Sequence, residues 1–257
     1  MAGRVVLSAF SALVGAFLLL PILAVVPAAF NGSSFIRLPP DNWSVRWWGA
    51  FFADQTWRRS LVTSLQVATL AAALSVVLGT AAALGIERLG GWVRQLALAL
   101  FVGPVIVPVI VLAVALYSLA RSVGLVGTTT MLAIAHTMLA LPYVALNVGV
   151  SLAALDPRLR LAATGLGASP WHAFRTVTLP LITPGVIGGA VFAFVTSFDE
   201  VVLSVFLAGP QAKTLPVRIW EEIRVEYTPI VAVAATIMIA LAVAAVAASR
   251  VIQRRDA

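Results

Sequence analysis

The feature that most constrains this chain is a series of long stretches that contain no Asp, Glu, Lys or Arg. A helix needs about 20 mostly apolar residues to cross the hydrocarbon core of a bilayer, and each stretch is long enough for one crossing. The stretches are continuously apolar rather than alternating at every second residue, as the strands of a membrane barrel would. The sequence therefore predicts an all-α membrane protein with six transmembrane helices, at residues 7–29, 61–86, 96–119, 129–150, 183–208 and 229–249.

The composition excludes the other large classes of protein. Of the 257 residues, 61% are hydrophobic and 11% are charged, whereas a soluble domain carries roughly a quarter of charged residues. A soluble, disordered or fibrous chain is therefore excluded. The formal net charge of +7 comes from Arg residues spread between the apolar stretches, which indicates contact with the bilayer surface and not with nucleic acid. The chain has no Cys, which excludes disulfides and thiol catalysis.

We divide the chain into three parts. Residues 1–60 would form the first transmembrane helix, retained because its apolar run exceeds the 7–15 residues typical of a signal peptide, and an outer amphipathic segment. Residues 61–249 would form a five-helix core, and residues 250–257 a basic tail. The Arg residues divide almost equally between the two sides of the membrane, so their count does not orient the chain. Arg4 and the basic tail favour termini on the cytoplasmic side.

The connection at residues 151–182 is longer than an ordinary loop and contains its own helix signals. Asp156 and Ser169 each precede a Pro, which predicts two helix starts with an acidic and a hydroxyl N-cap. Two Gly within residues 165–167 predict a bend between the two helices. The second helix is expected to stop before Pro180, because the residue before a Pro disfavours the helical conformation. A structured loop of this length indicates a docking surface.

The same loop carries a spaced motif. It consists of Ala162-Ala163, then Gly167 after three further residues, then Val177 and Leu179-Pro180 after nine more. In its spacing, and in its position between the fourth and fifth predicted helices, this motif resembles the EAA loop of the binding-protein-dependent ABC importer permeases. The Glu that opens the motif of that family is Leu161 here.

Two further stretches are similar to the spermidine/putrescine permease branch of that family. They are the segment from Trp43 to Trp48 and the run Ser197-Phe198-Asp199-Glu200. The resemblance implies the type I ABC importer permease fold in a bacterial plasma (inner) membrane, with both termini and residues 151–182 in the cytoplasm. It implies that the chain forms half of a substrate pathway in an ATP-driven importer of polyamines or related small organic solutes.

The resemblance also implies partners. These are ATP-binding ATPase subunits, a second permease subunit and an extracytoplasmic substrate-binding protein, besides the small-molecule substrate and the lipid bilayer. The ATPase would dock on a set of loop residues, namely Ala162, Ala163, Gly167, Ala168, Ser169, Pro170 and Trp171. The only Lys is Lys213, which lies in no phosphate-binding Gly-rich motif. We therefore expect no enzymatic activity, cofactor or metal in this chain, and ATP hydrolysis on the separate subunit.

Asp199 and Glu200 are charged residues in the outer half of the predicted helix 183–208. A carboxylate at the centre of a membrane helix costs about 2.5–3.5 kcal/mol on insertion scales, so its presence needs a reason. We expect this pair to line the substrate pathway and to attract a cation, with cation–π contacts from Trp43, Trp47 and Trp48 at the outer mouth. The alternative is a structural pairing with an Arg at the outer surface.

Two other functions are open to a chain of this kind. An ion-coupled secondary transporter would use Asp199 and Glu200 as proton or sodium sites, but the sequence shows no inverted repeat. An intramembrane enzyme would need a nucleophile with its base, or a metal cluster. His136 lies far from Asp199 in the sequence, and we predict that it is a hydrogen-bonded helix-packing residue.

Overall fold

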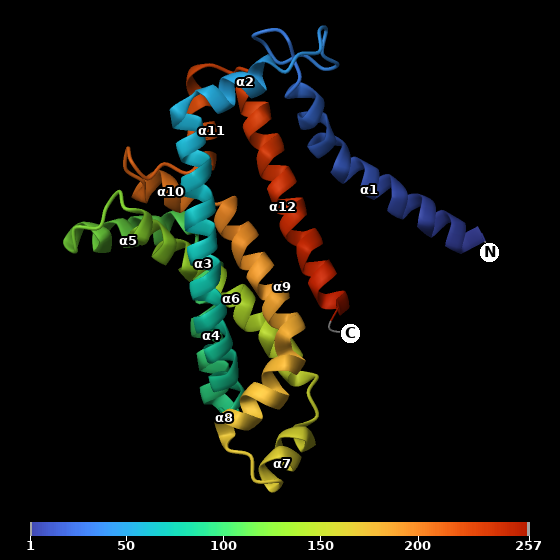
Figure 1. The fold of residues 1–257 in the computed structure, drawn as a ribbon, viewed down its shortest axis with the longest axis vertical. Helices are drawn as coiled ribbons and strands as arrows, with labels where there is room; N and C mark the ends of the chain where they lie inside the picture. Colours follow the sequence, from blue (N-terminus) through green and yellow to red (C-terminus); the bar gives the residue numbers. More distant parts are fainter. Residues whose placement is uncertain (1, 256–257) are drawn as a thin grey trace. The chain divides into compact units, whose positions relative to one another are not determined.

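The computed structural model describes residues 2–255, and nearly all of the described chain is helical (Figure 1). In chain order the helices are α1 (Ala2–Ala28), α2 (Arg46–Ala53), α3 (Gln55–Glu87), α4 (Gly91–Ile106), α5 (Val109–Ser122), α6 (Thr129–Ala153), α7 (Pro157–Gly165), α8 (Pro170–Ala173), the π-helix η1 (Phe174–Thr178), α9 (Leu179–Phe198), α10 (Val202–Leu207), α11 (Leu215–Val225) and α12 (Ile230–Arg255). Within the predicted basic tail, the described residues continue α12, and Asp256 and Ala257 lie outside the described residues.

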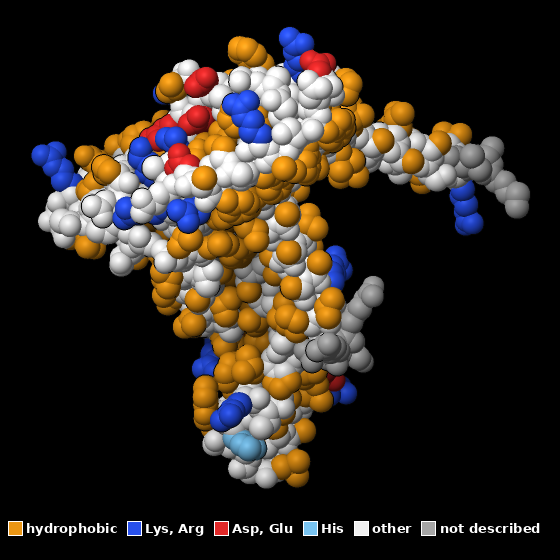
Figure 2. All heavy atoms as spheres, turned by 45° about the horizontal axis from the view of Figure 1, so that its top comes forward, with side chains coloured by type: hydrophobic (Ala, Val, Ile, Leu, Met, Phe, Trp, Pro, Cys, Tyr) orange, Lys and Arg blue, Asp and Glu red, His pale blue; other side chains and the backbone are white. Residues whose placement is uncertain are grey.

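Long apolar helices dominate the described chain. Those long and apolar enough to cross a membrane are Val6–Ala28, Gln55–Glu87, Thr129–Ala153, Pro170–Phe198 and Ile230–Gln253. A sixth crossing is available if α4 and α5 together form one. Figure 2 shows hydrophobic side chains over much of the visible surface, while most of the visible acidic side chains gather toward the top of the view. The predicted all-α membrane fold is therefore confirmed.

The predicted transmembrane span at residues 96–119 is sharply bent in the structure. The structure divides this stretch into α4 and α5, whose axes differ by 96°. The break lies at Val107, which is extended at φ −68° and ψ 133°, immediately before Pro108. Pro108 has no backbone N–H and its ring disfavours a helical residue before it. Hydropathy alone did not separate the two helices, because both are apolar.

Contacts between residues divide the chain into two compact units, which we describe separately. The first contains residues 1–60 and 217–241, and the second contains residues 61–216 and 242–257. In the first unit, Asp54 precedes α3 and caps it, because its Oδ1 accepts hydrogen bonds from the N–H and hydroxyl of Thr56, both at 2.6 Å. The hydroxyl bond from Thr56 lowers the pKa of Asp54 below its ordinary value of 3.8. The predicted outer amphipathic segment contains α2, which buries Phe51 against Trp57.

The second unit is built around α6. In the most apolar 18-residue stretch of this helix, 67% is buried, a larger share than in any other candidate span of the described chain. Its Val144 lies against two glycines on different helices. A Cβ added to Gly189 of α9 would lie 2.8 Å from the Cα of Val144, and a Cβ added to Gly79 of α3 would lie 2.8 Å from the Cβ of Val144. Small residues let membrane helices approach to backbone contact, which strengthens their van der Waals packing.

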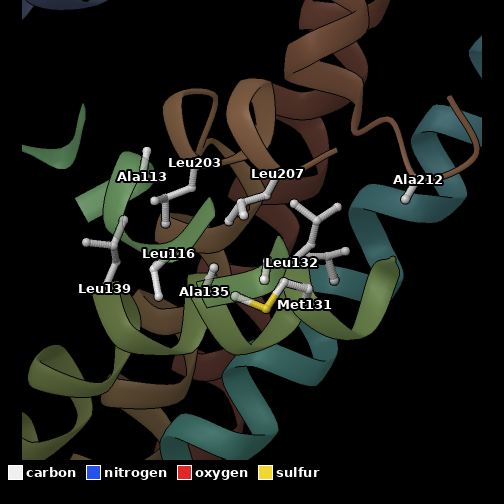
Figure 3. Packing of buried hydrophobic residues seen from close by; sticks show 11 residues of the cluster. Ala113, Leu116, Met131, Leu132, Ala135, Leu139, Leu203, Leu207 and Ala212 are labelled. Atoms are coloured by element: carbon white, nitrogen blue, oxygen red, sulfur yellow. The ribbon is translucent and has the colours of Figure 1, made fainter. Parts of the chain in front are cut away.

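A hydrophobic cluster packs one end of α6 against shorter helices. Figure 3 shows side chains of α5, α6 and α10 that point toward one another. Leu116 of α5, Leu132 of α6 and Leu203 of α10 are buried members of this cluster. The cluster therefore fixes α10, and with it the connection that precedes α10.

The close crossing at Val144 can be tested with neighbouring glycines of α9. Gly189→Ala should lower the free energy of unfolding by about 1–3 kcal/mol, because an added methyl group overpacks the contact. Gly188→Ala is the matched control, since its Cβ would approach nothing closer than the Asn147 Oδ1 at 3.5 Å. Both substitutions gain the same helix propensity, so the difference between them measures the contact. Thermal unfolding in detergent that is equal for the two variants would contradict the crossing.

Candidate substrate pathway and coupling loop

The acidic pair lies in a break between two helices. We predicted one continuous helix over residues 183–208 with Asp199 and Glu200 on it, and this is wrong, because α9 ends at Phe198 and α10 begins at Val202. The break is stabilised by Glu200, whose Oε1 accepts the N–H of Val202 at 2.9 Å and whose Oε2 accepts the N–H of Ser204 at 3.2 Å. A carboxylate that satisfies the first N–H groups of a helix favours a new helix start over a continuous helix.

His136 of α6 ties this break to the centre of the second unit. Its side chain is buried, with 1% of its surface exposed. Its Nδ1 lies 2.8 Å from the hydroxyl and 3.1 Å from the carbonyl of Ser197 at the end of α9, and its Nε2 lies 3.0 Å from the hydroxyl of Ser204 in α10. A neutral ring satisfies this set by donating from Nδ1 to the carbonyl and accepting at Nε2. His136 therefore connects three helices, and the helix-packing role that we predicted agrees with these contacts.

The two acidic residues have different surroundings. Glu200 is partly buried, caps α10 and places its Oε2 3.8 Å from the Nε2 of His136. Asp199 is exposed, and its carboxylate makes no hydrogen bond or ion pair within the described chain. Asp199 is therefore the carboxylate of this pair that is available to a ligand, and Glu200 shapes the backbone that presents it.

Sequence reasoning missed Ser197 and Ser204 as partners of His136. They lie 61 and 68 residues from His136 in the chain. A Ser in an apolar helix is common and carries no signal of its own, so only the helix arrangement brings the three residues together.

The long loop folds as its helix signals predicted. Asp156 caps α7, with its Oδ1 accepting the N–H of Arg158 at 2.9 Å, and Ser169 caps α8, with its Oγ accepting the N–H of His172 at 3.2 Å. Gly167 between the two helices adopts a φ of +88°, a conformation that side chains with a Cβ disfavour. The two predicted helix starts and the glycine bend between them are therefore confirmed.

The predicted helix stop before Pro180 is wrong. Residues Pro170–Phe198 form one continuous helical span that includes the π-helix η1. At its end the N–H of Leu179 bonds to the carbonyl of Phe174, five residues back. In a regular α-helix the ring of Pro180 would collide with the carbonyl of Thr176, and the wider π turn accommodates the proline without ending the helix.

The loop is anchored on one side and open on the other. The guanidinium of Arg160 in α7 bonds both carboxylate oxygens of Glu87, at the end of α3. On the open side Leu161, Leu166 and Trp171 are 69%, 90% and 68% exposed. Of the remaining predicted docking residues, Ala162, Gly167, Ser169 and Pro170 are exposed and Ala163 and Ala168 are partly buried. The loop thus presents an apolar surface and is held on its other side by the contact between Arg160 and Glu87.

The three tryptophans of the predicted outer mouth belong to the first unit. Trp43 is exposed, whereas Trp47 and Trp48 are partly buried. The indole N–H of Trp47 donates to the carbonyl of Ser33 at 3.0 Å, and the guanidinium of Arg46 lies 4.9 Å from the centre of its ring. Trp47 therefore already makes a cation–π contact with a neighbouring residue. Asp199 and Glu200 belong to the second unit.

Comparison with known proteins agrees with this architecture. Residues 75–255 match the family described as binding-protein-dependent transport system inner membrane component. The putrescine transport system permease protein PotI of Escherichia coli strain K12 is 32% identical over 230 residues, which cover 87% of this chain and 82% of PotI. The spermidine/putrescine transport system permease protein PotC of Haemophilus influenzae is 33% identical over 249 residues, or 97% of this chain and 96% of PotC.

Solved structures share the fold at lower sequence identity. A chain of the bacterial alginate ABC transporter, in complex with an alginate pentasaccharide-bound periplasmic protein, has a TM-score of 0.74 at 15% identity and covers 98% of this chain and 96% of its own. A chain of the inward-facing MetNI methionine ABC transporter has a TM-score of 0.61 at 19% identity, over 79% of this chain and 99% of its own. The resemblance that the loop motif indicated is confirmed, and the chain belongs to the binding-protein-dependent inner-membrane permeases, the membrane components of ABC importers.

Proposed function

We propose that this chain forms half of the pathway of an importer for polyamines or related small organic cations. The observation that carries the proposal is the open carboxylate of Asp199 at the break between α9 and α10. A cation that leaves water needs replacement acceptor oxygens and negative charge, and a carboxylate supplies both. The similarity to permeases named for putrescine and spermidine supports the same class of substrate.

An ATPase subunit docks on the loop formed by α7 and α8. The docking surface comprises Ala162, Ala163, Gly167, Ala168, Ser169, Pro170 and Trp171. Leu161 adds an exposed apolar side chain where the family motif has Glu, so the matching cleft of the ATPase is apolar at this point. The continuous helical span from Pro170 to Phe198, about 40 Å long at 1.5 Å per residue, carries movements of the loop to the acidic pair.

The complete importer contains a second permease subunit, two ATPase subunits and an extracytoplasmic binding protein. A structural relative was solved with a periplasmic protein that carries its ligand, which supports the last of these partners. In the plasma membrane both termini and residues 151–182 face the cytoplasm, and residues 30–60 and 209–228 face outward. Residues 1–60 then form the first transmembrane helix and the outer amphipathic segment, residues 61–249 the five-helix core, and residues 250–257 the basic cytoplasmic tail.

An ion-coupled secondary transporter is a weaker proposal. It would need Asp199 and Glu200 to hold a proton or sodium ion together, but the two oxygens of Glu200 accept backbone N–H groups of α10. Membership of the ABC importer permease family also favours ATP as the source of energy. We therefore retain the ATP-driven importer.

The role of Asp199 can be tested by uptake of radiolabelled putrescine and spermidine. Asp199→Asn should lower kcat/KM for uptake about tenfold, the effect of losing about 1.4 kcal/mol of attraction in the transition state for passage. The amount of assembled transporter should stay unchanged, because the Asp199 side chain has no partner in the described chain. Glu200→Gln is the comparison, and it should lower the amount of folded protein because Glu200 caps α10. Unchanged uptake by Asp199→Asn would contradict the proposed pathway.

The coupling role of the loop can be tested at its bend. Gly167→Ala should weaken copurification of the ATPase several-fold, because a left-handed conformation costs a residue with a Cβ about 1–2 kcal/mol and the bend must change to relieve it. Gly165→Ala is the matched control, since it is a neighbouring exposed glycine without a positive φ. Membrane insertion should be normal for both variants. Equal copurification of the ATPase by both would contradict docking at this bend.

The orientation can be tested by labelling of single Cys residues, since the native chain contains none. Ser33→Cys and Gln211→Cys should react with an impermeant thiol reagent in intact cells. Arg158→Cys, at an exposed position of α7, should react only after the cells are permeabilised. The opposite labelling pattern would place both termini outside the cytoplasm.

A further inference from the structure

An apolar groove of about 280 Å³ lies between the last turn of α3, α4 and the second half of α6. Ala83 and Ile86 of α3, Leu98 and Phe101 of α4, and Leu146 and Val150 of α6 contribute to its walls. All residues of α4 are described, and none of them is buried. The groove is therefore left open by the packing of the chain itself, although its walls are as apolar as a protein core.

One end of the groove carries positive charge. Glu87 and Arg94 line this end. The carboxylate of Glu87 is neutralised by Arg160, to which both of its oxygens are bonded. Arg94 makes no side-chain hydrogen bond or ion pair within the described chain, and neighbouring Trp92 is 73% exposed. A free guanidinium group close in sequence to an exposed Trp is typical of the headgroup level of a membrane.

The length of the groove matches one leaflet of a bilayer. Its lining on α6 runs from Pro142 to Ala153, about 16 Å along the helix axis at 1.5 Å per residue. The hydrocarbon core of a bilayer is about 30 Å thick, so one leaflet spans about 15 Å. Arg94 lies on the groove four residues before Leu98 and seven before Phe101, which places the charged end at the surface of that leaflet and the aromatic end near the bilayer centre.

We propose that this groove binds one acyl chain of an anionic phospholipid, whose phosphate is held by Arg94. Basic pockets between transmembrane helices bind anionic headgroups, and the planar guanidinium group matches a phosphate in two hydrogen bonds. A transmembrane helix with its side chains is about 10 Å across, too wide to enter a groove of this volume, whereas an extended acyl chain fits. The lipid completes the packing of α4 against α3 and α6.

Two substitutions separate the acyl and the headgroup parts of the site. Gly149 of α6 lines the groove, and a Cβ added to it would meet nothing within 4 Å. Gly149→Leu therefore places an apolar side chain in the groove, starting from a position with free space. Arg94→Gln removes one positive charge and leaves a shorter polar side chain that does not reach the phosphate. The matched controls are Gly85→Leu, whose Cβ would also meet nothing within 4 Å, and Arg121→Gln, an exposed Arg of α5. Neither control residue lines the groove.

The experiment is native mass spectrometry of the full-length chain in mild detergent, purified alone and with the subunits that copurify with it. Phosphatidylglycerol, phosphatidylcholine and inorganic phosphate are added separately as probes. We expect one phosphatidylglycerol molecule to be retained about tenfold more strongly than phosphatidylcholine, the size of effect that one charge-assisted contact gives. Arg94→Gln and Gly149→Leu should abolish this preference, and both controls should keep it.

Several results would overturn the proposal. Equal retention of phosphatidylcholine would show that charge plays no part, and displacement of the lipid by inorganic phosphate would identify a phosphate site without an acyl chain. Retention of phosphatidylglycerol by both Arg94→Gln and Gly149→Leu would place the lipid elsewhere. If the copurified assembly lacks the lipid that the chain alone retains, another subunit covers the groove. Because Arg94→Gln leaves the apolar walls intact, its result stands even if Gly149→Leu lowers expression.

Discussion

The arrangement of the second unit depends on one contact, the approach of Val144 in α6 to the glycines of α3 and α9. Lipid tails are as apolar as leucine, so burial from water does not drive these helices together, and close van der Waals packing has to do so. Gly79 and Gly189 allow this packing because neither places a Cβ between the backbones. Once α6 is held there, two residues that precede Val144 are placed as well: His136 contacts Ser204 after the break at the acidic pair, and Pro142 lines the groove beside α4.

The polar contacts of the second unit then build on that frame. His136 bonds to Ser197 and Ser204, and Glu200 caps α10, so the break in the helix is satisfied from within the chain. Backbone that is not helical is tolerated at membrane depth only when its polar groups have such partners or line a cavity. The same residues therefore keep the backbone stable and leave Asp199 open, which is how a costly charged group is kept accessible next to an apolar core.

Much of the fold and part of the candidate site could be predicted from the sequence, wherever the signal was local. The long apolar runs gave the helices, Asp156 and Ser169 gave the two caps, and Gly167 gave the bend of the loop. Three features escaped prediction: the sharp bend at Pro108, the break after Phe198 and the π turn before Pro180. At each of them both flanking segments are apolar, so hydropathy does not change at the boundary. What decides the outcome is the partner of each backbone group. At the break these partners are the neighbouring Glu200 and the distant His136, which lies 61 residues from the Ser197 carbonyl that it contacts.

The π turn at Phe174–Thr178 has a consequence for how the two ends of the long helix are matched to each other. A π turn holds one residue more than an α turn over the same rise, and one residue corresponds to about 100° of rotation around an α-helix axis. The wider turn therefore absorbs one extra residue, and the side chains of α9 that follow it keep the phase that an ordinary α turn would give them. In a regular α-helix the same extra residue would rotate Gly189 away from Val144 and Ser197 away from His136. The π turn thus lets the loop formed by α7 and α8 and the distant polar site keep their relative orientation, although the helix between them contains one additional residue.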